Sequence, residues 1–365
     1  RSLSSCLKTG CIFCALCFSV TLSPGAEAAT IAAGTFEELI QAAGRAQSND
    51  TINLTADITL DGDVGFPPGV TGLTIQGDGG PFTLQSSLSG GKPLYGLGVT
   101  KGDMIVFQNT NVDGMSLYMN LGDTAAASGK VTLKGSSDLV VAHGGKFLIT
   151  HFAEGSHTIL ESEAALLAGT AEKYVAEMYR KSAANPGQNL PAGVSWAPRI
   201  TANLEQLANS LVLTTSVDKS KASTLTWTGA VDGNVDRSTM NWRNGNNADF
   251  FATENDSLVF EGRNNVWDVS ATDINFVGNV VKAATITVRG ASDSNPDYRR
   301  DYTFSGAALE LSGSGGFVHN TADVFTWNAP SGGGTHKMDK FASGYGGNEG
   351  RSTLNRSLIQ ISEPT

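Results

Sequence analysis

Apolar and polar residues alternate with two different periods in the segment 35–60. Between residues 36 and 43 the apolar side chains recur at i, i+3, i+4 and i+7, which is the spacing of one helix face. These apolar residues are Phe36, Leu39, Ile40 and Ala43. Thr35 precedes them and Glu38 follows it by three positions, as in a capping box. We therefore predict a short amphipathic helix with the structural cap Thr35, Phe36, Glu38, Leu39 and Ile40.

The residues that follow have the period of a strand. Polar residues separate the apolar side chains Ile52, Leu54, Ala56, Ile58 and Leu60. This alternation predicts a strand with one buried face. Turns rich in Gly, Asp, Asn, Ser and Pro then separate further short apolar runs. We expect strands at 73–75, 82–84, 104–107, 115–121, 131–133, 139–141 and 147–149.

A succession of strands without helices between them argues against a doubly wound α/β fold. A β-sandwich and a β-solenoid remain. The single helix favours the solenoid, because the end of a stack of coils exposes apolar side chains that need a cover. We predict a mainly β fold, a parallel β-helix (solenoid) with an N-terminal capping helix.

Residues 161–215 break this pattern and are interpreted as a helical insertion that packs on the stack. Helical spacing is found at Leu167, Ala171, Tyr174, Val175 and Met178. A second set at i, i+4, i+7 and i+11 comprises Ile200, Leu204, Leu207 and Leu211. A binding lid is the alternative interpretation of this segment.

The first 28 residues have the features of a secretory signal peptide. Arg1 and Lys8 give a positive start, and a short apolar run follows before Pro24. A membrane anchor is the alternative, but that run is shorter than the roughly 20 residues needed to span a bilayer. The small residues of the expected cleavage site are Ala26, Ala28 and Ala29. All 4 cysteines lie in this segment, so the mature chain would form no disulfide.

Composition narrows the class of protein further. The chain has 365 residues with 43 glycines, 16% charged residues and a formal net charge of −10. Such a chain is typical of a turn-rich β protein rather than a disordered one. The acidic balance disfavours nucleic acid and anionic lipid as partners. No later apolar run is long enough for a transmembrane helix.

From Thr224 a new set of sequence blocks appears, in the order W-T-G, N-W, D-S-L-V-F-x-G, A-x-I-T-V-x-G and Y-T-F-S-G-x-x-L. Their order and spacing resemble the autotransporter-associated β-strand repeat over residues 224–316. The residues that carry the motif are Trp227, Gly229, Trp242, Phe260, Gly262, Gly290, Tyr302, Phe304 and Gly306. The opening helix and the strand after it are more loosely similar to the N-terminal cap and first coil of pectin-lyase-like β-helices.

This resemblance implies a right-handed parallel β-helix in an autotransporter passenger protein. It implies an outer-membrane β-barrel translocator as a partner, which the sequence itself does not contain. We expect five regions: a signal peptide (1–28), an N-terminal β-helix with its capping helix (29–160), a helical insertion (161–215), a repeat region (216–345) and a non-native or disordered tail (346–365).

Candidate chemistry is sparse, and we assign no catalytic, cofactor-binding or metal residue. The hypothesis of a metal site rests on His143, His151, Glu154 and His157, which lack the spacing of a helical site. A calcium hypothesis rests on Asp61, Asp63 and Asp78, although Asp is also a common turn residue. Two roles are possible for the four tryptophans of this region: they could stack on sugars or pack in the core. They are Trp227, Trp242, Trp267 and Trp327.

The sequence therefore predicts an exported, surface-displayed passenger fragment that acts in adhesion, display or structural spacing at the bacterial envelope. A glycan or host surface molecule is its candidate ligand. The alternative is a β-helical polysaccharide lyase or glycoside hydrolase, which needs acids and bases that converge on one face. The charged residues of the first stack are scattered in sequence: Asp57, Asp103, Asp113, Lys130, Lys134 and Asp138.

Overall fold

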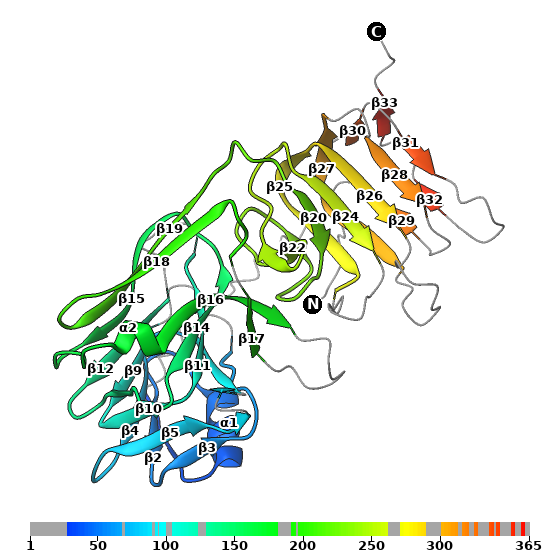
Figure 1. The fold of residues 1–365 in the computed structure, drawn as a ribbon. Coiled ribbons are helices and arrows are strands. Elements are labelled where there is room, and N and C mark those ends of the chain that lie inside the picture. Colours follow the sequence, from blue (N-terminus) through cyan, green and yellow to red (C-terminus); the bar gives the residue numbers. More distant parts are fainter. Residues whose placement is uncertain are drawn as a thin grey trace, which may run out of the picture.

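The strands of residues 28–217 wind into a stack of parallel coils with three sheets, called the first stack (Figure 1). The computed structural model describes residues 28–67, 70–89, 92–93, 95–99, 104–122, 129–181, 191–194, 196–261, 271–289, 301–312, 316–320, 325–327, 336–338, 341–343, 352–354 and 359–361. The whole parallel solenoid makes about 7 turns. The predicted mainly β solenoid is therefore confirmed.

The three sheets of the first stack are built from parallel strands, with antiparallel strands added at one end. Sheet A contains β1 (Thr30–Ala33), β2 (Thr51–Leu54), β4 (Leu73–Gly77), β9 (Met104–Gln108), β12 (Lys130–Lys134), β15 (Gly155–Ser162), β19 (Ser210–Val217) and β18 (Ile200–Gln206). Sheet B contains β3 (Ile58–Leu60), β5 (Phe82–Ser86), β10 (Thr110–Asp113) and β13 (Leu139–Val140). Sheet C contains β8 (Gly96–Val99), β11 (Ser116–Asn120), β14 (Gly145–His151), β16 (Tyr174–Lys181) and β17 (Pro191–Val194). A small hairpin joins β6 (Leu88–Ser89) to β7 (Lys92–Pro93).

Side chains at matching positions of successive coils form one dry column inside the stack. In sheet A the register places Ile52 beside Ile75, Ile75 beside Phe107, and Phe107 beside Leu133. All four side chains are buried in the same hydrophobic cluster. Strands β2, β4 and β12 bury every second residue, so the alternation seen in the sequence places these side chains in the column.

Helix α1 (Phe36–Arg45) covers the outer end of this column, as predicted (Figure 1). Leu39, Ala42 and Ala43 are its buried residues and join the cluster of the first coils. Phe36 packs against the same cluster while remaining partly exposed. The prediction was wrong for Ile40, whose side chain is 37% exposed. The buried face of the helix is centred on Ala42 instead.

The cap of this helix is formed by two side chains. The backbone N–H of Glu38 donates to Thr35 Oγ1 at 3.2 Å, and Glu38 Oε2 accepts the N–H of Gly34 at 2.8 Å. The Glu38 carboxylate therefore binds one residue before the position expected of a capping box. The first bond satisfies an amide that the helix leaves without an internal partner, and the second ties the helix to the residue before its cap.

The predicted helical insertion at 161–215 is wrong for most of its length. Helix α2 is a single turn (Thr170–Lys173), and the rest of the described segment forms β16, β17, β18 and β19. Tyr174 and Met178 are buried on β16, which runs parallel to β14, whereas Val175 is 37% exposed. A spacing of four residues fits one helix face and also one strand face, and this shared spacing explains the error.

The same ambiguity affected Ile200, Leu204, Leu207 and Leu211. Strands β18 and β19 form an antiparallel hairpin in which Leu204 faces Leu213. Leu207 lies in the turn of that hairpin and is 46% exposed. The hairpin ends sheet A, where β19 pairs antiparallel with β15.

The second stack has two main sheets and lies beyond the β18–β19 hairpin (Figure 1). Sheet D contains β23 (Asn247–Asp249), β22 (Trp242–Asn244), β20 (Thr224–Trp227), β24 (Ser257–Glu261), β26 (Thr285–Arg289), β28 (Phe317–Asn320) and β31 (Phe341–Ser343). Sheet E contains β21 (Asn234–Val235), β25 (Asp273–Ala283), β27 (Tyr302–Leu311), β29 (Phe325–Trp327), β32 (Ser352–Leu354), β30 (His336–Met338) and β33 (Ile359–Ile361).

Aromatic residues of the sequence blocks fill the core of this second stack. Phe260 has its ring centroid 5.6 Å from Trp227, 5.4 Å from Trp242 and 4.7 Å from Phe304. Tyr302 lies 5.5 Å from Phe260 and donates its hydroxyl to Glu261 O at 2.8 Å. These side chains are buried, so Trp227 and Trp242 are core residues. Trp267 lies outside the described residues.

Two glycines of the motif occupy positions that other residues would strain. Gly229 has φ +56°, and a Cβ there would lie 2.8 Å from Ala271 N. Gly306 has φ +94°, and its Cβ would lie 2.3 Å from Phe276 O. Both positions need a residue without a side chain. Gly262 and Gly290 lie outside the described residues.

The C-terminal end of the chain contains two short strands. A non-native or disordered tail was expected at 346–365, but within it Ser352–Leu354 pairs with β29 and Ile359–Ile361 pairs with β30, both in parallel register. These two segments are therefore strands, and a non-native origin of the tail stays a prediction. Residues 1–27, including Ala26, lie outside the described part of the chain. Within the described part, no helix has the length and apolar character required to cross a membrane.

Candidate functional site

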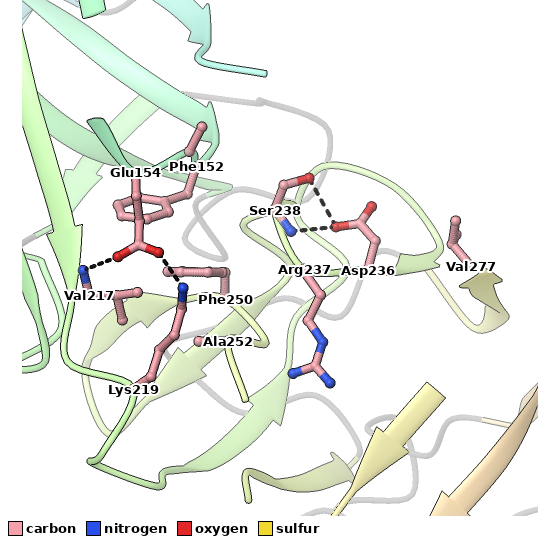
Figure 2. Close-up of a pocket in the computed structure, with 11 residues that line it drawn as sticks. Phe152, Glu154, Val217, Lys219, Asp236, Arg237, Ser238, Phe250, Ala252 and Val277 are labelled. Atoms are coloured by element: carbon pink, nitrogen blue, oxygen red, sulfur yellow. Dashed lines mark hydrogen bonds and ion pairs between the residues drawn. The ribbon is translucent and has the colours of Figure 1, made fainter. Parts of the chain in front are cut away.

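A hollow of about 660 Å³ lies where the first stack meets the second (Figure 2). The first stack contributes the segments around Phe152 and Val217, and the second contributes those around Asp236 and Phe250. Its lining consists of Phe152, Ala153, Glu154, Val217, Lys219, Asp236, Arg237, Ser238, Phe250, Ala252 and Val277. This volume is within the range of small-molecule sites, which span about 300–1,000 Å³.

Two stacked phenylalanine rings form the dry base of the hollow. The centroids of Phe152 and Phe250 lie 4.4 Å apart, and each side chain is only 3% exposed. The backbones are joined beside them, because Phe152 N–H donates to Ser238 O at 2.7 Å and Met240 N–H donates to Thr150 O at 3.0 Å. The base therefore joins the two stacks, and a ligand would meet mainly the polar rim.

On one side of the rim Glu154 and Lys219 form an ion pair (Figure 2). Glu154 Oε1 also accepts the N–H of Val217 at 3.2 Å. Burial acts to raise the pKa of Glu154, but the hydrogen bonds from Lys219 and Val217 outweigh it and lower that pKa. Glu154 is therefore ionised at neutral pH and is held by its partner.

The other side of the rim carries Asp236 and Arg237. Asp236 accepts hydrogen bonds from the N–H and hydroxyl groups of Ser238 and Thr239, at 2.7–3.2 Å. Its carboxylate is therefore held by hydrogen bonds within this turn. Arg237 places its guanidinium 3.9 Å from the centroid of Phe251 and donates to Lys282 O at 3.1 Å.

Arg237 and Lys219 are the two cations that line the hollow. Partial burial lowers the pKa of Arg237, and the charges of Asp256 and Glu254 oppose that shift. Within the ranges the structure describes, no carboxylate oxygen is found in an ion pair with this side chain, whereas Lys219 is paired with Glu154. The rim can thus donate hydrogen bonds to an acidic or hydroxylated ligand.

Beneath the junction a buried arginine connects three segments. Arg199 Nη1 lies 2.7 Å from Asp256 Oδ1, and Arg199 Nε lies 3.2 Å from Asp249 Oδ2. Arg199 Nη2 also donates to Phe250 O at 2.8 Å. The guanidinium just before β18 is therefore bound by carboxylates of the second stack.

The pKa values of this group reflect burial and pairing. Burial raises the pKa of Asp249, and the charge of Arg199 and the N–H of Phe250 oppose it. For Arg199, burial acts to lower the pKa, but its hydrogen bond and charge interactions with Asp256 and Asp249 raise it. Sequence reasoning missed this group, because no local pattern distinguishes a buried arginine from an exposed one.

The four residues of the metal hypothesis do not meet. His143 Nδ1 lies 2.9 Å from Asp113 Oδ1, while His157 is buried with Nε2 3.0 Å from Ala153 O. His151 lies on β14, and Glu154 belongs to the rim described above. Among the residues that the structure places, no group of three or more His, Cys, Asp or Glu side chains is arranged to hold a metal ion.

The acidic residues of the calcium hypothesis are also separate. Asp63 Oδ1 accepts from the N–H of Gly96 and from the hydroxyl of Tyr118, each at 2.9 Å. Burial raises the pKa of Asp63, and these two hydrogen bonds oppose it. Asp78 accepts from Asn53 Nδ2 at 3.3 Å. These carboxylates bind turns and strands of the fold.

The expected cleavage site lies at the start of the described chain. Ala28 is exposed, and Ala29 is the first residue with bonds to the solenoid. The N–H of Ala29 donates to Asp50 Oδ1 at 2.7 Å, and Ala29 O accepts from Thr51 N–H at 2.8 Å.

Comparison of the sequence with protein-family models, curated proteins and solved structures finds no match. The resemblance to the autotransporter-associated repeat therefore rests on the sequence blocks alone.

Proposed function

We propose that this protein is an exported β-solenoid that acts in adhesion, display or structural spacing at the bacterial cell surface. The observation that carries the proposal is the buried Arg199 group, which fixes two solenoid stacks to each other. A stack of coils with a continuous apolar column is stiff along its axis, and each coil contacts mainly its neighbours. Two such stacks, joined at a dry interface, suit a protein that holds a surface at a distance from the cell.

The ligand contact in this proposal is the rim of the junction hollow. Arg237 is the lead residue, because guanidinium groups bind carboxylates through two parallel hydrogen bonds. An acidic glycan has both the carboxylates and the hydroxyl groups that such a rim can bind. The hollow volume of about 660 Å³ would accommodate a short saccharide.

Two measurements test the proposal. Protease treatment of intact cells that express the tagged chain should remove the tag, and the purified protein should bind acidic glycans on an array. Arg237→Ala should weaken that binding at least about tenfold, whereas Arg45→Ala, on helix α1 at the outer end of the first stack, should leave it unchanged. A tag that stays protected in intact cells would overturn export, and equal loss in both variants would overturn the assigned contact.

A second candidate function is a polysaccharide lyase or hydrolase, favoured by one side-chain pair. Asp113 binds Nδ1 of His143 through both oxygens, at 2.9 and 3.0 Å, and the imidazole is half exposed. A carboxylate that orients an imidazole in this way is an arrangement used by general bases. Release of unsaturated sugars from acidic polysaccharides, lost in His143→Ala, would support this function over adhesion.

A further inference from the structure

The nitrogen atom of Ala29 lies against a buried carboxylate at the open edge of the first coil. Asp50 is 4% exposed, and its Oδ1 is 2.7 Å from Ala29 N. The other oxygen, Oδ2, accepts the N–H of Gln47 at 2.8 Å. Both carboxylate oxygens are thus occupied by backbone nitrogens, and one of these belongs to the residue that opens the fold.

Ala29 is where the ladder of sheet A begins. Its carbonyl accepts the N–H of Thr51, and from Thr30 onward β1 pairs residue by residue with β2. Ala28, on the other side of the peptide bond, and Ala29 are both exposed. Small residues also stand one and three positions before Ala29, at Ala28 and Ala26, as a leader peptidase requires. The small residues indicate the bond before Ala29, and Asp50 lies against the nitrogen atom that cleavage of this bond would free.

We propose that the chain is processed between Ala28 and Ala29 and that Asp50 binds the α-ammonium group released at Ala29. In this hydrolysis water adds across the peptide bond. Its oxygen goes to the acyl carbon of Ala28, which becomes a carboxylate, and its protons leave Ala29 as an ammonium group. The processing step rests on the proposed export, whereas the ion pair is a property of the folded chain.

Charge explains why a carboxylate is suited to this position. An amide donates one hydrogen bond, but an ammonium group adds a full positive charge at the same place. A buried carboxylate is costly unless it is paired, and the new terminus would supply the pair. An open hollow of about 610 Å³ at this corner gives the terminus room, and Arg45 is the other cation that lines it.

The ion pair is tested with purified chains that begin at Ala29 or at Ala28 and continue to Thr365. Moving the start by one residue moves the charge by about 3.8 Å and leaves every described strand in place. The Ala29 chain should melt about 2–4 °C higher than the Ala28 chain. With Asp50→Asn in both chains this difference should disappear. Equal melting temperatures of the two wild-type chains would overturn the ion pair.

A second measurement covers the case in which Asp50→Asn prevents folding. The α-amine of the wild-type Ala29 chain should react more slowly with an amine-modifying reagent at pH 8 than that of the Ala28 chain. The two chains differ only at the terminus, so equal rates would also overturn the ion pair.

Processing is tested in cells by the mass of the exported chain. The full sequence is expressed behind an initiator Met, and the exported protein is recovered by its C-terminal tag. A first residue of Ala29 supports the proposal, and any other first residue overturns the processing step. Absence of exported protein would overturn the proposed function instead, and the melting comparison of the purified chains would still decide the ion pair.

Discussion

The guanidinium of Arg199 and the carboxylate of Asp256 lie 2.7 Å apart, with side chains that are 2% and 0% exposed. Arg199 precedes the hairpin that ends the first stack, and Asp256 precedes β24 in the second. Two stacks that each bury their own apolar column are thereby joined through a charged contact from which water is excluded.

Replacement of Arg199 by Ala should therefore destabilise the protein strongly. The change leaves Asp249 and Asp256 buried without their cation, and the loss of one partner of a buried ion pair typically costs about 3–5 kcal/mol. The free energy of unfolding, measured by urea denaturation, should fall by about that amount. Lys219→Ala removes an exposed ion pair with Glu154 and should cost less than about 1 kcal/mol. Similar losses in the two variants would contradict a special role for the buried group.

Gly306→Ala should destabilise the second stack more than Gly245→Ala. Both glycines have positive φ, at +94° and +61°, but a Cβ on Gly306 would lie 2.3 Å from Phe276 O, whereas a Cβ on Gly245 would meet nothing within 4 Å. Gly245→Ala should therefore cost only the backbone strain, about 1–2 kcal/mol. Thermal melting of both variants separates the two effects, because Gly245→Ala adds only backbone strain and Gly306→Ala adds strain and a steric clash. A larger loss of stability in Gly245→Ala would contradict the close contact between residue 306 and Phe276 O.

Stability should decrease below neutral pH in a way that depends on His157. Burial lowers the pKa of His157, and its hydrogen bond with Ala153 O opposes the shift. The folded pKa is thus below the unfolded value of about 6.5, so the unfolded chain binds the proton more readily. The contribution of His157 is complete above about pH 6.5 and is lost as the pH falls through and below that value. Melting temperatures recorded from pH 7.5 to pH 5 should decline less steeply in His157→Gln; parallel curves would assign the decline to other groups.

The solenoid could be predicted from the sequence because apolar and polar residues alternate strictly in its first strands. In 51–60 every second residue is apolar, and the structure buries Ile52, Leu54 and Ile58 as expected. In 174–178 the signal failed, because Tyr174 and Met178 fit a strand and a helix equally well. Only the pairing of β16 with β14, a contact between distant segments, decides between the two.

The junction was not predictable, for a related reason. Arg199, Asp249 and Asp256 stand in three separate segments, and each one taken alone resembles a surface charge. Their meeting depends on how the hairpin β18–β19 leads into the second stack. Ala29 was predicted as part of a cleavage site from its small neighbours, and that cleavage stays a prediction. Its hydrogen-bond partner Asp50 was not singled out, because the contact joins residues 21 positions apart.

In helix α1, which covers the first coil, two adjacent residues provide a test and its control. Leu39 is fully buried against the column, and Ile40 is 37% exposed. Leu39→Ala should cost about 2–5 kcal/mol, because it opens a cavity between the helix and the column. Ile40→Ala should change stability by less than about 1 kcal/mol, since it removes little buried surface. Amide hydrogen exchange adds a spatial readout: in Leu39→Ala the amides of β1 and β2 should exchange faster, while those of β24 and β26 keep their protection. Equal costs for the two variants, or loss of protection in both stacks at once, would show that α1 does not act as a local cover for the end of the column.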